Sequence, residues 1–225
     1  MFDRLRKAFG SSPADGYPSY QDVAAWAVEQ KLSIVPHAVE EGHFELTGDL
    51  DGHPWRLECG ASTRDYLRGL ELRGRADVGA DPDVAVMLIN RPLKEALEGT
   101  AYSAITDTLQ TTVSANLPEE IRWLAMCDEV DWPELPASFY QHFAVVTDRI
   151  EHAQRWVHAP VVMSLLGLVE SEGGAANAES PVLLMLMRGK VYLRMQHTRR
   201  SLPEVAQAVQ VLLEGAQSAL RHLQA

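Results

Sequence analysis

Two groups of basic side chains are the residues best suited to bind a ligand, because guanidinium and ammonium groups recognise carboxylates and phosphates. The first group places five cations and no acid within 188–200, and the second lies within 56–75, where three acids partly offset it. If the two groups fall on neighbouring strands, we expect them to line one site for an anionic ligand or an acidic segment. The residues expected there are Arg56, Arg73, Arg75, Arg188, Lys190 and Arg194. The alternative is that these cations only pair with the chain's own excess of acids.

An acidic stretch from Glu119 to Glu134 carries six acids and one arginine. A stretch of this kind is usually a solvated surface. It also contains Trp123 and Trp132, and large aromatic surface beside charge is typical of protein interfaces. We therefore interpret Trp123 and Trp132 as candidate partner-binding residues.

The sequence lacks the motifs whose spacing defines a catalytic mechanism. It has no phosphate-binding loop, no dinucleotide-binding glycine pattern, no Gly-x-Ser-x-Gly turn and no Cys-x-x-Cys or His-Glu-x-x-His. His37 and His43, with Glu40, Glu41 or Glu45, have the ligand types of a metal site, but we prefer to interpret them as partly exposed strand residues. We therefore predict no catalytic residue, no metal and no cofactor, and lean against an enzyme.

Length and charge argue against several classes of protein. The chain has 225 residues, with 20 Lys and Arg against 31 Asp and Glu, which gives a net charge of −11. A surface this acidic repels the phosphate backbone, so we expect no nucleic-acid partner. Cys59 and Cys127 are too few for a disulfide scaffold or a structural zinc site. The longest apolar run, 156–169, is shorter than the roughly 20 residues of a membrane span, and no secretory signal is visible, so we expect a soluble, cytoplasmic protein.

The amino-terminal composition suggests where the domain begins. Residues 1–18 combine a short amphipathic segment, 1–9, with a linker rich in Gly, Ser and Pro, and we interpret them as a tail. Segment 1–9 is a candidate for weak contact with a membrane surface, although a tail that frays or docks on the domain is the preferred interpretation. We predict that 19–225 form a single domain, and the alternative is two closely packed halves, 19–112 and 113–225.

The elements that must position these residues begin with a helix after Ser19 and a strand at 32–35. Apolar alternation on both sides of Asp51-Gly52 predicts a β-hairpin, because both turn positions need positive φ. Further strands are expected at 70–78 and 84–89, which gives an antiparallel meander of four or five strands. A helix is expected after the meander, with Asn90 as its cap.

The second half of the chain contains helices, a strand and a second hairpin. Residues 99–114 fit a helix and a strand equally. We expect a strand at 139–147, then a long helix from about 148 that Pro160 should kink or divide. The second hairpin joins 182–187 to 191–195 through Gly189-Lys190, which suits a type II′ turn. A final amphipathic helix is expected from Leu202 to Leu223.

Strands cluster along the chain instead of alternating with helices, so the predicted fold class is α+β. We expect an antiparallel sheet, formed by a meander plus a C-terminal hairpin, that packs against amphipathic helices. In charge and layout the chain is broadly similar to small acidic bacterial secretion chaperones. These features favour a non-enzymatic protein-interaction factor, accessory or chaperone-like, whose partner is another protein or a second copy of the chain. The alternative is a small anionic-ligand binder or an enzyme with a site lined by the strand arginines.

Overall fold

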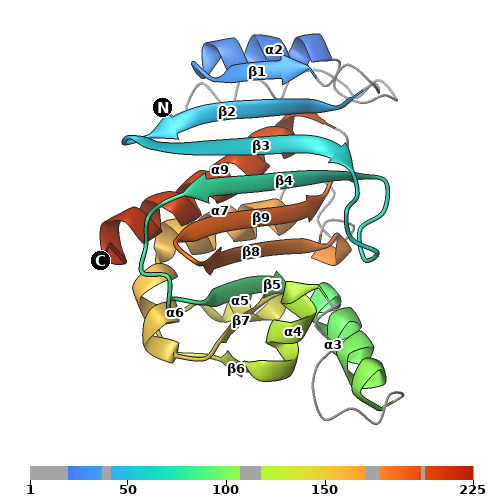
Figure 1. The fold of residues 1–225 in the computed structure, drawn as a ribbon, viewed down its shortest axis with the longest axis vertical. Coiled ribbons are helices and arrows are strands. Elements are labelled where there is room, and N and C mark those ends of the chain that lie inside the picture. The colour runs from blue at the N-terminus through green and yellow to red at the C-terminus, as the bar shows by residue number, and fades with distance from the viewer. Residues whose placement is uncertain (1–19, 37–41, 107–117, 171–177, 199–200, 225) are drawn as a thin grey trace.

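The computed structural model describes residues 20–36, 42–106, 118–170, 178–198 and 201–224 (Figure 1). Its helices are α2 (Tyr20–Glu29), α3 (Arg91–Thr106), α4 (Glu119–Met126), α5 (Ala137–His142), α6 (Ile150–Trp156), α7 (Ala159–Glu170) and α9 (Leu202–His222). Its strands are β1 (Ser33–Pro36), β2 (Phe44–Leu50), β3 (His53–Ala61), β4 (Leu70–Asp77), β5 (Val86–Asn90), β6 (Asp128–Val130), β7 (Phe143–Thr147), β8 (Val182–Met187) and β9 (Lys190–Gln196). The tail 1–18, with its amphipathic segment 1–9, lies outside the described residues.

The strands form one antiparallel sheet in the order β1-β2-β3-β4-β9-β8-β5-β7-β6. The predicted α+β class is confirmed. The meander is β1 to β4, and the C-terminal hairpin is β8 and β9. The fifth strand expected in the meander, β5, lies instead between β8 and β7, because β9 takes the place beside β4.

The two hairpin turns have the same local cause. Asp51 and Gly52 both adopt positive φ, at 54° and 86°, as the Asp-Gly pair predicts. In the second hairpin the positive φ values belong to Arg188 (49°) and Gly189 (72°). The prediction of a type II′ turn at Gly189-Lys190 is therefore wrong. The turn lies one residue earlier, and two successive residues with positive φ are typical of type I′. Lys190 is the first residue of β9 and not part of the turn.

The main core lies between one face of the sheet and helices α2, α5, α6, α7 and α9. Figure 1 shows α9 crossing behind β3, β4 and β9. The inward residues expected for this helix are all buried: Val205, Val209, Leu212, Ala216, Ala219 and Leu223. The indole of Trp156 donates a hydrogen bond to the Gly215 carbonyl at 2.9 Å, which fixes α6 against α9. The main core thus packs α9 against the strands that carry the basic residues.

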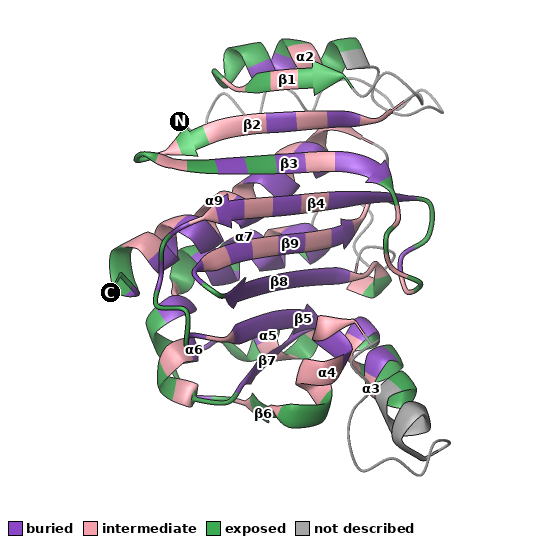
Figure 2. Cartoon of the chain, viewed as in Figure 1, coloured by how far each residue is buried: buried purple, intermediate pink, exposed green. Residues whose placement is uncertain are grey.

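The opposite face of the sheet has two different parts. On β5, β7 and β8 it is apolar and forms a smaller core with α3 and α4. On β3, β4 and β9 it is charged, and Figure 2 shows that buried residues alternate with half-buried or exposed ones along most of these strands. We call this second part the charged face; it bears Arg56, Glu58, Glu71, Arg73, Arg75, Asp77, Lys190, Tyr192 and Arg194.

Four local expectations can be compared with the structure. The first part of the strand expected at 139–147 is the short helix α5, and only β7 is extended. Asn90 does not cap α3: its amide donates to the Ala178 and Ser180 carbonyls and accepts from the Val182 amide, so it ties β5 to β8 instead. The long helix divides into α6 and α7 before Pro160, as expected. In the ambiguous range 99–114, α3 continues to Thr106, and 107–114 lie outside the described residues.

Candidate functional site

Five of the six cations expected in the site share the charged face. The two basic segments are neighbours, because β4 pairs with β9. Arg73 lies directly opposite Arg194 in this pairing, and Arg75 lies opposite Arg56 in the pairing of β4 with β3. Lys190 lies opposite Asp77. Arg188 is separate from them, since it stands at the turn of the second hairpin and contacts α4 through Glu119 at 2.8 Å.

The cations at the outer part of the charged face pair with acids beside them. Arg56 lies 3.6 Å from Glu58, while Arg75 and Lys190 lie 3.7 and 3.5 Å from Asp77. The side chains of Arg56 and Arg75 are 50% and 41% exposed, and exposed ion pairs of this length contribute about 0–1 kcal/mol each. These pairs neutralise the surface without fixing the direction of the guanidinium groups.

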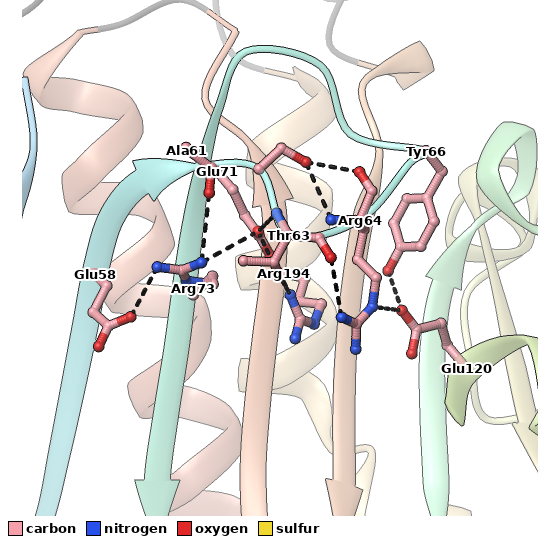
Figure 3. Close-up of polar contacts among 10 residues, drawn as sticks. Glu58, Ala61, Thr63, Arg64, Tyr66, Glu71, Arg73, Glu120 and Arg194 are labelled. Atoms are coloured by element: carbon pink, nitrogen blue, oxygen red, sulfur yellow. Dashed lines mark hydrogen bonds and ion pairs between the residues drawn. The ribbon is translucent and has the colours of Figure 1, made fainter. Parts of the chain in front are cut away.

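Arginines near the β3–β4 loop, residues 62–69, are held much more firmly, and Thr63 is the centre of their contacts (Figure 3). The amide and hydroxyl of Thr63 both donate to Glu71 Oε2 at 2.9 Å. Arg194 Nη1 donates to the Thr63 hydroxyl at 2.9 Å and also to Glu71 Oε1. Arg64 Nη1 donates to the Thr63 carbonyl at 3.2 Å. Thr63 therefore brings the guanidinium groups of Arg64 and Arg194 together.

Glu71 is the buried anion behind these contacts. Its side chain is fully buried, and a buried carboxylate is tolerated only when it is paired and hydrogen-bonded. Arg73 Nη1 lies 3.9 Å from Glu71, while Arg73 Nη2 lies 3.1 Å from Glu58. Arg73 also donates to the Ala61 carbonyl at 3.5 Å. We call Arg64, Arg73 and Arg194, with Thr63 and Glu71, the arginine cluster.

A second buried carboxylate, Glu120 of α4, holds the other end of the same loop. Its Oε1 accepts hydrogen bonds from Arg64 Nε and from the Tyr66 hydroxyl, both at 2.6 Å. Burial by itself raises the pKa of Glu120, but the hydrogen bonds from Arg64 and Tyr66 outweigh it and leave that pKa below its ordinary value. Burial and the Glu120 charge raise the pKa of Tyr66, so the phenol stays protonated and donates. The loop is thus tied to both the sheet and α4.

Trp132 and Trp123, the expected partner-binding residues, occupy different places. Trp123 is half-buried and packs against the smaller core with α3 and α4. Trp132 lies in the loop between β6 and α5. Its backbone amide donates to the Tyr140 hydroxyl at 2.9 Å, and that hydroxyl donates to the Trp132 carbonyl at 3.2 Å. The structure does not bring the two indoles together, and each belongs to a separate region of the molecule.

Trp132 lines a hollow of about 480 Å³ between its loop and the corner where α6 meets α7. Four buried apolar side chains form its floor: Trp132, Leu135, Val157 and Val162. Met163 stands at the rim with 63% of its surface exposed. The lining is completed by Glu134, Pro136, Gln154, His158 and Ala159. Sequence reasoning found Trp132 but missed this hollow, because its walls come from two segments about 20 to 30 positions apart.

Acidic side chains lie on one side of this hollow, because Glu134 lines it and Asp131 directly precedes Trp132. Burial, followed by the negative charges of Asp131, Glu129 and Glu134, raises the pKa of Tyr140. Glu129 is neutralised by Arg91 and Lys94 at 3.0 and 3.1 Å. Asp131 and Glu134 are exposed, and no ion pair engages either of them within the described residues. The side of the hollow formed by this loop therefore carries negative charge, while the floor is apolar.

A second hollow, of about 770 Å³, borders the charged face next to β1. Arg56, Arg75 and Lys31 line it, together with Asp49 and Asp77. Both cations and acids thus line this hollow, and of the six expected site residues only Arg56 and Arg75 belong to it. The firmly held arginines, Arg73 and Arg194, lie elsewhere.

The buried nucleophile candidates are not prepared for reaction. Burial, with a smaller contribution from the charge of Glu204, raises the pKa of the Cys59 thiol to about 12. A thiol with such a pKa is almost entirely protonated at neutral pH and is a poor nucleophile. His197 Nδ1 lies 2.7 Å from Glu204 Oε2, and Glu204 also accepts from the Thr198 amide at 3.0 Å. This buried pair joins the end of β9 to the start of α9.

The described residues contain no group of three His, Cys, Asp or Glu side chains arranged to hold a metal ion. His37, Glu40 and Glu41, considered as metal ligands from the sequence, lie outside the described residues. None of the described helices combines the length and the apolar composition needed to cross a membrane. No protein-family model, no curated protein and no solved structure matches the chain.

Proposed function

We propose that the protein is a non-enzymatic protein-interaction factor, accessory or chaperone-like, which acts in the cytoplasm and binds an apolar side chain of a partner segment in the hollow beside Trp132. One observation carries this proposal: four buried apolar side chains form the floor of a surface hollow whose rim bears the exposed Met163. Apolar surface that remains accessible in this way is typical of protein-binding sites. A hollow of about 480 Å³ is large enough for one aromatic or long aliphatic side chain.

The partner segment is apolar at its centre and basic at its flanks. Glu134 in the lining and Asp131 beside Trp132 give this side of the hollow a negative charge, and complementary charge guides association and discriminates against acidic partners. Met163 adapts its shape to different anchors, because methionine is unbranched and polarisable. The partner is another protein or a second copy of the chain.

The hollow needs little rearrangement before it binds. Tyr140 contacts both backbone groups of Trp132 and so fixes the loop that forms one wall. The opposite wall is the first part of α7, in which Val161 and Val162 are anchored in the main core. A preformed site loses less conformational entropy on binding than a mobile one, which favours affinity.

Fluorescence anisotropy with two labelled peptides tests this proposal. Both probes have a central Phe and Leu; one is flanked by Lys and Arg, the other by Glu and Asp. We expect the basic peptide to bind at least about tenfold more tightly than the acidic one, because each flank meets Asp131 and Glu134. Equal affinity of the two peptides, or saturable binding by neither, would contradict the proposal.

Variants of the hollow make the test specific. Ala159→Leu places an apolar side chain in the hollow from an exposed position, so we expect it to weaken the basic peptide about tenfold or more. Met163→Ala should weaken it several-fold. Met126→Ala is the matched control, because Met126 is 67% exposed on α4 and does not line the hollow. If Ala159→Leu and Met126→Ala bind the peptide equally well, the hollow is not the binding site.

A further inference from the structure

We infer that the arginine cluster is a binding site for a small oxyanion, a carboxylate or phosphate group, which Arg64, Arg73 and Arg194 hold beside the β3–β4 loop (Figure 3). The juxtaposition that carries this inference is the convergence of Arg64 and Arg194 on Thr63, with Arg73 directly opposite Arg194 in the sheet. This site is separate from the hollow beside Trp132, since helices α6 and α7 pack on the other face of the sheet.

The guanidinium groups are fixed from behind by buried acceptors. Glu71 is fully buried and binds Arg194, and Glu120 is 1% exposed and binds Arg64. The Thr63 hydroxyl and carbonyl occupy one further N–H of each arginine. An arginine whose fork is already oriented loses little side-chain entropy when it binds an anion.

Arg64 and Arg194 retain hydrogen-bond donors. Within the described residues, Nε and Nη2 of Arg194 and Nη2 of Arg64 donate no hydrogen bond. The side chains of Arg64, Arg73 and Arg194 are 26%, 28% and 21% exposed, so solvent reaches them. Planar carboxylates and tetrahedral phosphates both accept two parallel N–H groups from such a fork.

The other cations of the charged face do not share these properties. Arg56 and Arg75 are 50% and 41% exposed and pair with Glu58 and Asp77, which are accessible. Arg73 also contacts Glu58, so Arg64 and Arg194, which are held by buried carboxylates, are the most firmly oriented cations. In the arginine cluster the buried Glu71 and Glu120 bind Arg194 and Arg64, whose side chains remain 21% and 26% exposed. Of the six cations expected in a ligand site, this inference keeps Arg73 and Arg194. It includes in addition Arg64 of the β3–β4 loop.

Isothermal titration with inorganic phosphate and with succinate, at constant ionic strength, tests the inference. We expect saturable binding of at least one of them at concentrations up to about 10 mM. Tighter binding of phosphate identifies a phosphate-bearing ligand, and tighter binding of succinate identifies a carboxylate-bearing one. Arg64→Lys and Arg194→Lys keep the charge but remove the fork, so each should weaken binding about tenfold or more.

The controls separate a specific site from general charge attraction and from loss of fold. Arg149→Lys changes an exposed arginine outside the cluster and should alter affinity less than about twofold. Glu71→Gln/Arg194→Gln removes the buried acid and its partner together, which preserves the fold better than either change alone, and should also abolish binding. Ala159→Leu should bind the anion as the wild type does.

The inference is overturned if neither anion binds saturably. It is equally overturned if Arg64→Lys, Arg194→Lys and Arg149→Lys, each with a wild-type circular dichroism spectrum, all bind like the unmodified protein. Because Ala159→Leu reports on the hollow and Arg194→Lys on the cluster, failure of the peptide experiment and failure of this one are distinguishable.

Discussion

Among single side chains, the two buried carboxylates do the most to organise the charged face. Glu71 gathers Thr63, Arg73 and Arg194, and Glu120 gathers Arg64 and Tyr66. Partners of Glu71 come from positions 8 and 123 residues away along the chain. Through these contacts the two carboxylates hold the β3–β4 loop against the sheet and α4.

Glu120→Gln should destabilise the protein in a pH-dependent way. The folded-state pKa of Glu120 is lowered, so its contribution to stability is present above the unfolded-state pKa and is lost as the pH falls through the folded-state value. At about pH 7 we expect the free energy of unfolding to decrease by about 1–3 kcal/mol, since the hydrogen bonds to Arg64 and Tyr66 lose their charge assistance. Urea titrations of both proteins at about pH 7 and about pH 3 measure this. A difference that stays constant across that interval would show that the Glu120 charge is not its origin.

The two cysteines should differ sharply in reactivity. Cys59 is buried with a thiol pKa raised to about 12, whereas Cys127 is half-buried and its thiol pKa is raised less far by burial and by Asp148 and Asp128. We expect a thiol reagent to modify Cys127 in the native protein and Cys59 only after unfolding in denaturant. Mass spectrometry of the labelled peptides distinguishes the sites. Rapid native labelling of Cys59 would contradict its burial.

Among the elements, α9 and β4 pack tightly at Gly74. A Cβ added at Gly74 would lie 2.9 Å from Leu212 Cδ2 of α9 and 3.0 Å from Leu193 Cβ of β9. Gly74→Ala should therefore decrease the free energy of unfolding by about 1–3 kcal/mol, because the helix or the strand must move. Gly167→Ala in α7 is the matched control: nothing lies within 4 Å of its added Cβ, and alanine favours a helix by up to about 1 kcal/mol. Equal melting temperatures for the two variants would show that this contact is not tight.

Elements with a local physical cause were predictable from the sequence. Asp51-Gly52 supplies the positive φ of its turn, and Pro160 separates α6 from α7. The failure at α5 has an equally local reason: Phe139 and Phe143 are four residues apart, a spacing that places both on one face of a strand and also on one face of a helix. In the structure the two rings stack with centroids 5.5 Å apart.

Contacts between distant segments were predictable only in part. The alternation of Arg73 and Arg194 with apolar residues placed both on exposed sides of strands, and the charged face follows from that pattern. The pairing of β4 with β9 could not be predicted from the sequence, because strand order depends on long-range packing rather than on the residues of either strand. Thr63 carries no local signal either, since its role comes from Glu71 and Arg194.

At the scale of the whole molecule, the strand order joins the two halves of the chain. β8 and β9, from the second half, lie between β4 and β5 of the first, and β5 lies between β8 and β7. The prediction of one domain over 19–225, against two halves divided at 112, therefore has a direct thermodynamic test. We expect a single unfolding transition that coincides by far-ultraviolet circular dichroism and by tryptophan fluorescence. Fragment 19–112 keeps β4 and β5 but lacks every strand that pairs with β5, so neither it nor 113–225 should fold alone, as judged by amide dispersion in nuclear magnetic resonance spectra. Two separate transitions, or a folded isolated fragment, would establish two domains, and the single-domain prediction would then be wrong.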